Sequence, residues 1–128
     1  MADPLATTAR AAQAQAYAPY SHYRVGAAIE AEDGRVFTGC NVENASYGLT
    51  VCAERNAIAA AVCAGALRFR RIVVTTDSDP PASPCGACRQ VLAEFGADME
   101  VVSVGPTRTL RWRLEELLPS AFAKQQLD

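Results

Sequence analysis

The stretch that decides the fold is residues 72–104, IVVTTDSDPPASPCGACRQVLAEFGADMEVVSV. It begins with a β-branched run at 72–76 and ends with an apolar run at 99–104, and both runs are typical of buried strands. Between them, residues 88–95 have helical composition, and Gly96 follows as a stop signal. A strand, a helix and a strand in this order predict a right-handed crossover between two parallel strands.

The rest of the chain adds helices and a hairpin. Asp3 and Pro4 resemble a helix N-cap followed by proline at the first helical position, and Gly34 lies in a turn between two apolar runs. The predicted elements are a helix at 5–16, strands at 25–31 and 35–42, a helix at 52–65 and a short helix at 114–118. Together they predict one α/β domain over residues 1–128, with three α-β-α layers and a mixed central sheet.

Composition narrows the class of protein. Half of the 128 residues are hydrophobic, but the longest apolar stretch, residues 57–67, is too short to span a bilayer, and no signal peptide pattern precedes it. We therefore expect a cytoplasmic protein with no membrane partner. A net charge of -2 disfavours nucleic acid as a partner and favours a small neutral substrate. The arginines near residues 68–71 and 108–113 fit solvated faces or subunit contacts.

The cysteines indicate metal chemistry. Their number is five, and an odd count without an export signal is poor evidence for disulfides. Cys85 and Cys88 form a CxxC pair, whose sulfurs lie on one side of a first helical turn. A CxxC pair alone also fits a redox pair or two buried thiols. Upstream, Cys52-Ala53-Glu54 supplies CxE, and CxE followed by PCxxC resembles the signature of zinc-dependent nucleobase deaminases.

Three thiolates would leave one tetrahedral position of a zinc ion open for water, as a catalytic site requires. A fourth protein ligand would make the site structural. Cys63 lies eleven residues after Cys52, about 16 Å along a continuous helix, so it cannot reach the same ion. Cys40 in a predicted strand and His22 in a loop stay open as alternatives.

Glu54 needs a geometric argument of its own. Residues two apart in a regular helix point about 200° away from one another, so Cys52 and Glu54 converge only if Cys52 lies at or before the N-cap. The alternative is a glutamate favoured in the first turn by the helix dipole. Arg55, with Arg89 as second choice, is predicted to donate a hydrogen bond to a ligand sulfur and offset the thiolate charge. The alternative for both is an ordinary surface arginine.

From residue 17 to residue 122, the sequence resembles the small homotetrameric cytidine deaminases of pyrimidine salvage. The stretches that carry the resemblance are PYSHYRVGA at 19–27, GCNVENASY at 39–47, CAER at 52–55, SPCGACRQ at 83–90 and LLP at 117–119. The resemblance implies hydrolytic deamination of cytidine and deoxycytidine to uridine and deoxyuridine, with ammonia released. It also implies that Cys52, Cys85 and Cys88 bind one Zn²⁺ per subunit and that Glu54 carries the protons.

The resemblance further implies a set of substrate-binding residues: Tyr23, Asn41, Glu43, Ala53, Tyr47 and Phe122. Asn41 and Glu43 would hold the ribose hydroxyls, and their donor and acceptor atoms suit that role. The alternative interpretation of Asn41 and Glu43 is that they form a turn at the end of a strand, because Asn favours turns. Tyr23 stands where the family usually has Phe, and a base can stack on either ring. Arg24 replaces the Pro that usually follows, which alters the expected loop.

By the same resemblance, Tyr47 and Phe122 would reach the site of a neighbouring subunit, so that the site is completed only in the homotetramer. The alternative for Phe122 is a local hydrophobic anchor for the tail. Two rival functions stay open: a structural zinc module, which Glu54 disfavours, and a deaminase of another substrate. For the second, residues 41–44 argue against a nucleoside antibiotic of blasticidin type, and the acidic charge argues against nucleic acid.

Overall fold

The computed structural model describes residues 3–127, and its centre is a sheet of five strands in the order β2-β1-β3-β4-β5. The strands are β1 (Gly26–Ala31), β2 (Val36–Cys40), β3 (Phe69–Thr75), β4 (Glu100–Val104) and β5 (Thr109–Arg113). β3 and β4 are parallel, whereas the other neighbouring pairs are antiparallel. The mixed sheet and the parallel crossover are therefore confirmed.

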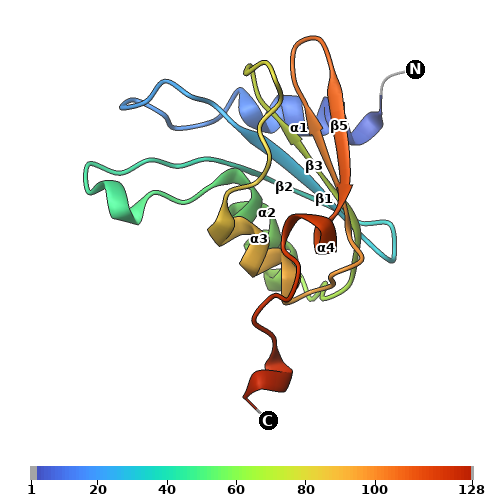
Figure 1. Ribbon diagram of the computed structural model, residues 1–128. Helices are drawn as coiled ribbons and strands as arrows, with labels where there is room; N and C mark the ends of the chain where they lie inside the picture. The colour runs from blue at the N-terminus through green and yellow to red at the C-terminus, as the bar shows by residue number, and fades with distance from the viewer. Residues whose placement is uncertain (1–2, 128) are drawn as a thin grey trace.

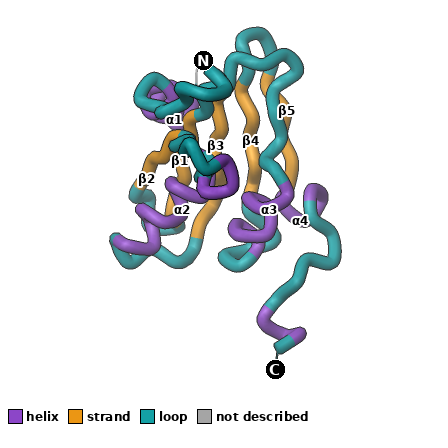
Figure 2. The backbone as a smooth tube through the Cα atoms, turned by 90° about the vertical axis from the view of Figure 1, so that its left-hand side faces the viewer, coloured by secondary structure: helices purple, strands orange, loops and turns teal. Residues whose placement is uncertain are grey.

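Helices cover both faces of this sheet (Figures 1 and 2). They are α1 (Pro4–Gln13), α2 (Ala53–Cys63), α3 (Gly86–Ala93) and α4 (Leu114–Leu117), with 3-10 turns η1 (Tyr47–Leu49) and η2 (Lys124–Gln126). In β3, Ile72 and Val74 face the core cluster formed with α2. Val73, between them, packs with Leu5 and Ala9 of α1 on the opposite face. This alternation confirms the three α-β-α layers.

The structure corrects several predicted boundaries. α1 ends at Gln13 rather than 16, because the backbone of Tyr17 turns away to pair with Asn41 and Glu43. α3 begins at Gly86 rather than 88, so that Cys85 is its N-cap. The fifth strand, β5, was not predicted at all.

Gly39 of β2 sets how closely α2 approaches the sheet. A Cβ atom at residue 39 would lie 2.4 Å from the carbonyl oxygen of Ala53 and 2.4 Å from the amide nitrogen of Ala57. Only glycine allows the first turn of α2 to lie this close to the strand. The absence of a side chain at Gly39 therefore places the start of α2, which carries Cys52 and Glu54.

After α4, the chain leads away from the sheet in both views and forms η2 (Figures 1 and 2). Among residues 3–127, no helix is long and apolar enough to cross a membrane.

Candidate active site and metal centre

Two helix starts bring three sulfurs together. Cys52 is the N-cap of α2 and Cys85 is the N-cap of α3, both in extended backbone conformation, and Cys88 lies in the first turn of α3. The Sγ atoms of Cys52 and Cys85 are 3.9 Å apart, and those of Cys85 and Cys88 are 3.5 Å apart. All three sulfurs lie within 4.8 Å of one another. The N-cap position of Cys52 is the one that its convergence with Glu54 required.

The donor set of this cluster fits zinc. Thiolates are soft ligands that select zinc among the common divalent ions, and three of them at this spacing can hold one ion. Within the part of the chain that the structure describes, Cys40, Cys63 and His22 do not join the group. The sequence-based alternatives for a fourth ligand are therefore not supported by the fold.

The thiols have strongly unequal acidities. Hydrogen bonding with the Cys88 thiol, together with the Arg55 guanidinium, lowers the pKa of Cys52 to about 5. The same contact with Cys52, together with burial, raises the pKa of Cys88. The cluster therefore carries negative charge at neutral pH. Binding of zinc stabilises this charge and displaces the protons that remain on the other thiols.

Arg55 supplies one positive charge beside the sulfurs. Its Nη2 lies 3.4 Å from the Sγ of Cys52, as the sequence predicted for this arginine. Arg89, the second choice for this role, forms no hydrogen bond to a sulfur among residues 3–127. Its guanidinium donates instead to the carbonyl oxygens of Pro84, at 2.7 Å, and Leu117, at 2.8 Å. Arg89 therefore ties α3 to α4, because its planar fork spans the two chain segments.

Glu54 is a buried carboxyl group, with 5% of its surface exposed. Burial raises its pKa, and the negative charge of Cys52 acts in the same direction. A buried carboxyl group with a raised pKa holds a proton more readily than a solvent-exposed one, a property that suits proton transfer.

Glu54 lines a cavity of about 190 Å³. Its other lining residues include Cys52 and Cys85 of the metal centre, together with Ala53, Tyr23 and Asn41. We name this space the Glu54 cavity. Six further residues that line it were not singled out as site residues from the sequence: Val25, Thr50, Val74, Thr76, Ala82 and Ser83. Only Thr76 could have been suspected from the sequence, because it lies at the carboxyl end of a predicted strand, where ligands bind in α/β folds.

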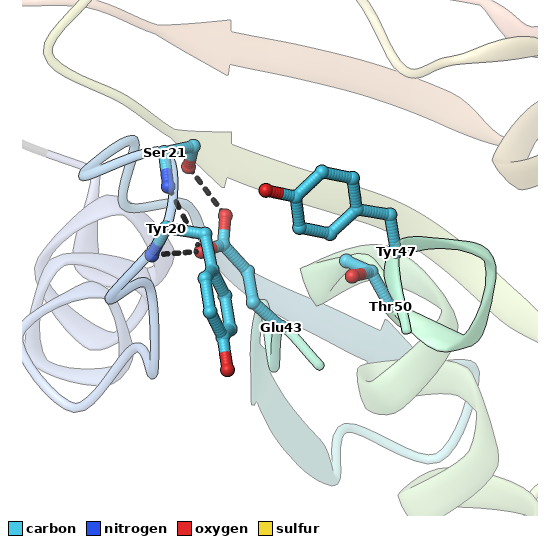
Figure 3. Close-up of a pocket in the computed structure, with 5 residues that line it drawn as sticks. All are labelled: Tyr20, Ser21, Glu43, Tyr47 and Thr50. Carbon is cyan, nitrogen blue, oxygen red and sulfur yellow. Dashed lines mark hydrogen bonds between the residues drawn. The ribbon is translucent and has the colours of Figure 1, made fainter. Parts of the chain in front are cut away.

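A second cavity, of about 250 Å³, adjoins the first at Thr50, which lines both. Figure 3 shows its walls, in which the Glu43 carboxylate faces the loop that carries Tyr20 and Ser21. Glu43 accepts hydrogen bonds from the backbone nitrogens of Tyr20, at 3.0 Å, and Ser21, at 3.1 Å, and from the Ser21 hydroxyl. The hydroxyl contact holds the pKa of Glu43 below its usual value. Glu43 is thus an ionised acceptor beside the Glu54 cavity.

The remaining predicted substrate residues differ in how they reach these cavities. The side chain of Asn41 accepts from the nitrogen of Val25 at 2.9 Å and donates to the carbonyl of Tyr23 at 2.7 Å. Tyr47 lines the second cavity with 75% of its surface exposed. Phe122 lines neither cavity, and its carbonyl accepts from Gln90 at 2.8 Å. Within one chain, the fold therefore does not bring Phe122 to the site.

Comparisons with known proteins agree with this geometry. Residues 2–104 match the family model described as the cytidine and deoxycytidylate deaminase zinc-binding region. A probable cytidine deaminase of Dictyostelium discoideum is 50% identical over 121 residues, which cover 93% of this chain and 82% of that protein. The cytidine deaminase of Sporosarcina psychrophila is 45% identical, with 98% of this chain and 94% of that protein covered.

Solved structures give the same result. The crystal structure of cytidine deaminase from Burkholderia pseudomallei superposes with a TM-score of 0.89 at 48% identity, covering 92% of this chain and 96% of that chain. Cytidine deaminase from Mycobacterium tuberculosis gives a TM-score of 0.80 at 46% identity, with 92% and 94% covered. The fold and the three-cysteine cluster therefore define a zinc-binding deaminase domain. Within that class, the chain belongs to the cytidine deaminase family.

Proposed function

We propose that this chain hydrolyses cytidine and deoxycytidine to uridine and deoxyuridine, with release of ammonia. One observation carries the proposal: the buried Glu54 and two of the three clustered sulfurs lie on the wall of one cavity. The relatives named cytidine deaminase support the same activity. The net charge of -2 and a cavity of about 190 Å³ fit a single neutral nucleoside better than a nucleic acid strand.

Cys52, Cys85 and Cys88 would hold the zinc ion. Bound in such a site, zinc supplies Lewis acidity that lowers the pKa of water to about 7. Glu54 accepts one proton of the attacking water and delivers it to the ring nitrogen N3. It then takes the second proton from the hydroxyl group now on C4 and passes it to the amine, whose bond to C4 breaks. Water thus provides the oxygen of the new carbonyl group, and the amino group departs as ammonia.

The other cavity residues bind and orient the nucleoside. Tyr23 offers a ring on which the base can stack, and Ala53 contributes to the wall next to the metal centre. Asn41 lines this cavity and Glu43 lines the adjoining one, where the ribose hydroxyls would find an amide and an ionised carboxylate. The existing hydrogen bonds of both side chains hold them in place for this contact.

We further propose that the protein is a single-domain subunit of a homotetramer that serves cytoplasmic pyrimidine salvage. Tyr47, with 75% of its surface exposed, and Phe122, with 59%, are large apolar side chains on the surface of one chain. Contact of these two residues with a neighbouring subunit's cavity would bury them and complete the site.

The activity is tested with purified protein and four substrates: cytidine, deoxycytidine, cytosine and dCMP. Loss of absorbance near 280 nm and release of ammonia measure deamination, with and without a zinc chelator. We expect turnover of both nucleosides, little turnover of cytosine or dCMP, and loss of activity on chelation. Glu54→Gln keeps the shape of the side chain and removes its proton transfer, so we expect a loss of about 10²- to 10⁴-fold in kcat.

Metal content of the Glu54→Gln variant serves as the control, because Glu54 is not a proposed ligand. Full activity in that variant would refute the assigned proton path. Absence of turnover of either nucleoside by the zinc-loaded wild type would refute the proposed function itself.

A further inference from the structure

Three hydroxyl groups form a hydrogen-bonded chain at the Glu54 cavity. The Tyr23 hydroxyl lies 3.1 Å from the Oγ of Ser78, and that Oγ lies 2.9 Å from the Oγ1 of Thr76. The backbone nitrogen of Ser78 also donates to the Thr76 Oγ1, at 3.4 Å. The two ends of the chain, Tyr23 and Thr76, both line the cavity, although 53 positions separate them in the sequence.

The Thr76 end of this chain is fixed. Thr76 is fully buried, and its nitrogen donates to the carbonyl of Val104 at 3.1 Å. Its own carbonyl accepts a hydrogen bond from the Arg10 guanidinium at 3.0 Å, which ties α1 to the end of β3. The Thr76 hydroxyl is therefore an anchor attached to the sheet.

Without its contact to Ser78, the Tyr23 side chain would not be fixed. Tyr23 belongs to the loop between α1 and β1, and 41% of its surface is exposed, so packing alone does not fix its ring. Its backbone is held on one side, where the carbonyl accepts from Asn41 at 2.7 Å and the nitrogen donates to the Ser21 Oγ at 3.0 Å. The contact with Ser78 holds the far end of the ring, so the side chain is fixed at both ends.

We propose that the Tyr23–Ser78–Thr76 chain is a positioning device that holds the Tyr23 ring flat against the bound base. This inference rests on the proposed function, because it assumes that the base occupies the Glu54 cavity. A ring that is ordered before binding loses less rotational freedom when the nucleoside arrives, so the contact strengthens binding. Tyr23 and Ser78 act on affinity and not on proton transfer, which belongs to Glu54.

The test is a double-mutant cycle of Tyr23→Phe, Ser78→Ala and their combination. Steady-state kinetics with cytidine give kcat and KM, and inhibition by the product uridine reports binding without a chemical step. We expect each single variant to raise KM and the uridine inhibition constant by about three- to tenfold, with kcat changed less than about twofold. The double variant should be no worse than the poorer single variant, because both remove the same contact.

Two control variants separate this role from a general structural one. Ser78→Thr retains a hydroxyl group and should recover most of the wild-type affinity. Tyr17→Phe removes the hydroxyl of a tyrosine that lines neither cavity, and its KM should match the wild type. Circular dichroism and melting temperatures of all variants establish that each protein is folded.

Wild-type KM in Tyr23→Phe and Ser78→Ala, or fully additive effects in the double variant, would overturn the positioning role and leave the deaminase function intact. A wild-type protein that releases no ammonia from cytidine would instead refute the proposed function, and this inference with it.

Discussion

The Nη2 atom of Arg55 lies 3.4 Å from the Sγ atom of Cys52, which is the N-cap of α2. Residues three apart at the start of a helix share one face, so the CxER pattern places a cation directly beside a thiolate. Three thiolates on one zinc ion leave a formal charge of -1, which weakens the ion as a Lewis acid. A guanidinium on one sulfur withdraws part of that charge.

Replacement of Arg55 by Gln should therefore lower kcat/KM for cytidine by about 10- to 100-fold while zinc stays bound. The amide keeps much of the length of the side chain but removes its charge. Activity and zinc content per chain are measured on the same preparation. Arg70→Gln is the matched control, because Arg70 donates to the carbonyl of Glu32 on an exposed surface. Wild-type kinetics in Arg55→Gln would refute this role.

Substitutions of two cysteines, one inside the metal centre and one outside it, should differ sharply in their effect on zinc content and activity. Cys88 is buried within the cluster, whereas Cys63 is exposed near the end of α2 and outside it. Cys88→Ser should lose most of its zinc and its activity, because a hydroxyl is a poor substitute for a soft thiolate. Cys63→Ser should retain both. Equal zinc content in the two variants, measured by elemental analysis after dialysis, would contradict the assigned ligands.

Much of this fold could be predicted because its core strands and helices have strong local patterns. The run from Ile72 is β-branched and buried, and the CxxC pair marks a helix start, so the crossover follows from local sequence. β5 lacks such a pattern, because Arg111 and Arg113 alternate with partly exposed side chains at the edge of the sheet. The same arginines were interpreted as solvated faces or subunit contacts, and short polar edge strands leave little signal.

The metal cluster was predictable for a similar reason, whereas the cavity was not. Cys52, Glu54, Cys85 and Cys88 fall in two short motifs whose spacing carries chemical meaning. Thr76 and Ser78 have no motif, and their meeting with Tyr23 depends on how the loop after α1 folds over the end of β3. Tertiary contacts of this kind have no period or spacing in the sequence.

Close packing at Gly39 predicts that Gly39→Ala is strongly harmful. The added methyl group would lie 2.4 Å from backbone atoms of α2, which cannot give way by themselves, so the start of the helix must move. We expect a loss of about 1–3 kcal/mol in the free energy of unfolding, together with weaker zinc binding. Denaturant unfolding and metal titration measure the two effects.

Gly48→Ala is the matched control, because a Cβ atom at residue 48 would meet no atom within 4 Å. Its free energy of unfolding should stay within about 0.5 kcal/mol of the wild type. Equal stability and equal zinc affinity in the two variants would show that α2 is not held by this contact.

The start of α1 gives the last prediction, which concerns pH. The Asp3 carboxylate caps α1 at the nitrogen of Leu5, 3.0 Å away, and accepts from the Arg71 Nη2 of β3, also at 3.0 Å. The hydrogen bond from Arg71 lowers the pKa of Asp3 below its ordinary value of 3.8. A carboxyl group whose pKa is lowered by folding adds stability above its unfolded pKa, and that stability is lost as the pH falls through the folded pKa.

Asp3→Asn keeps an N-cap acceptor and removes only the charge, so it isolates the ion pair. From pH 7 down to about pH 5, the wild type should be more stable than Asp3→Asn by about 1 kcal/mol, since the pair is only partly exposed. Below about pH 4 the difference should shrink, because Asp3 becomes protonated in the wild type. Asp33→Asn, which removes the more exposed pair with Arg35, should have a smaller effect at every pH. Urea unfolding at each pH measures these differences, and a gap between the wild type and Asp3→Asn that widens on acidification would contradict the assigned ion pair.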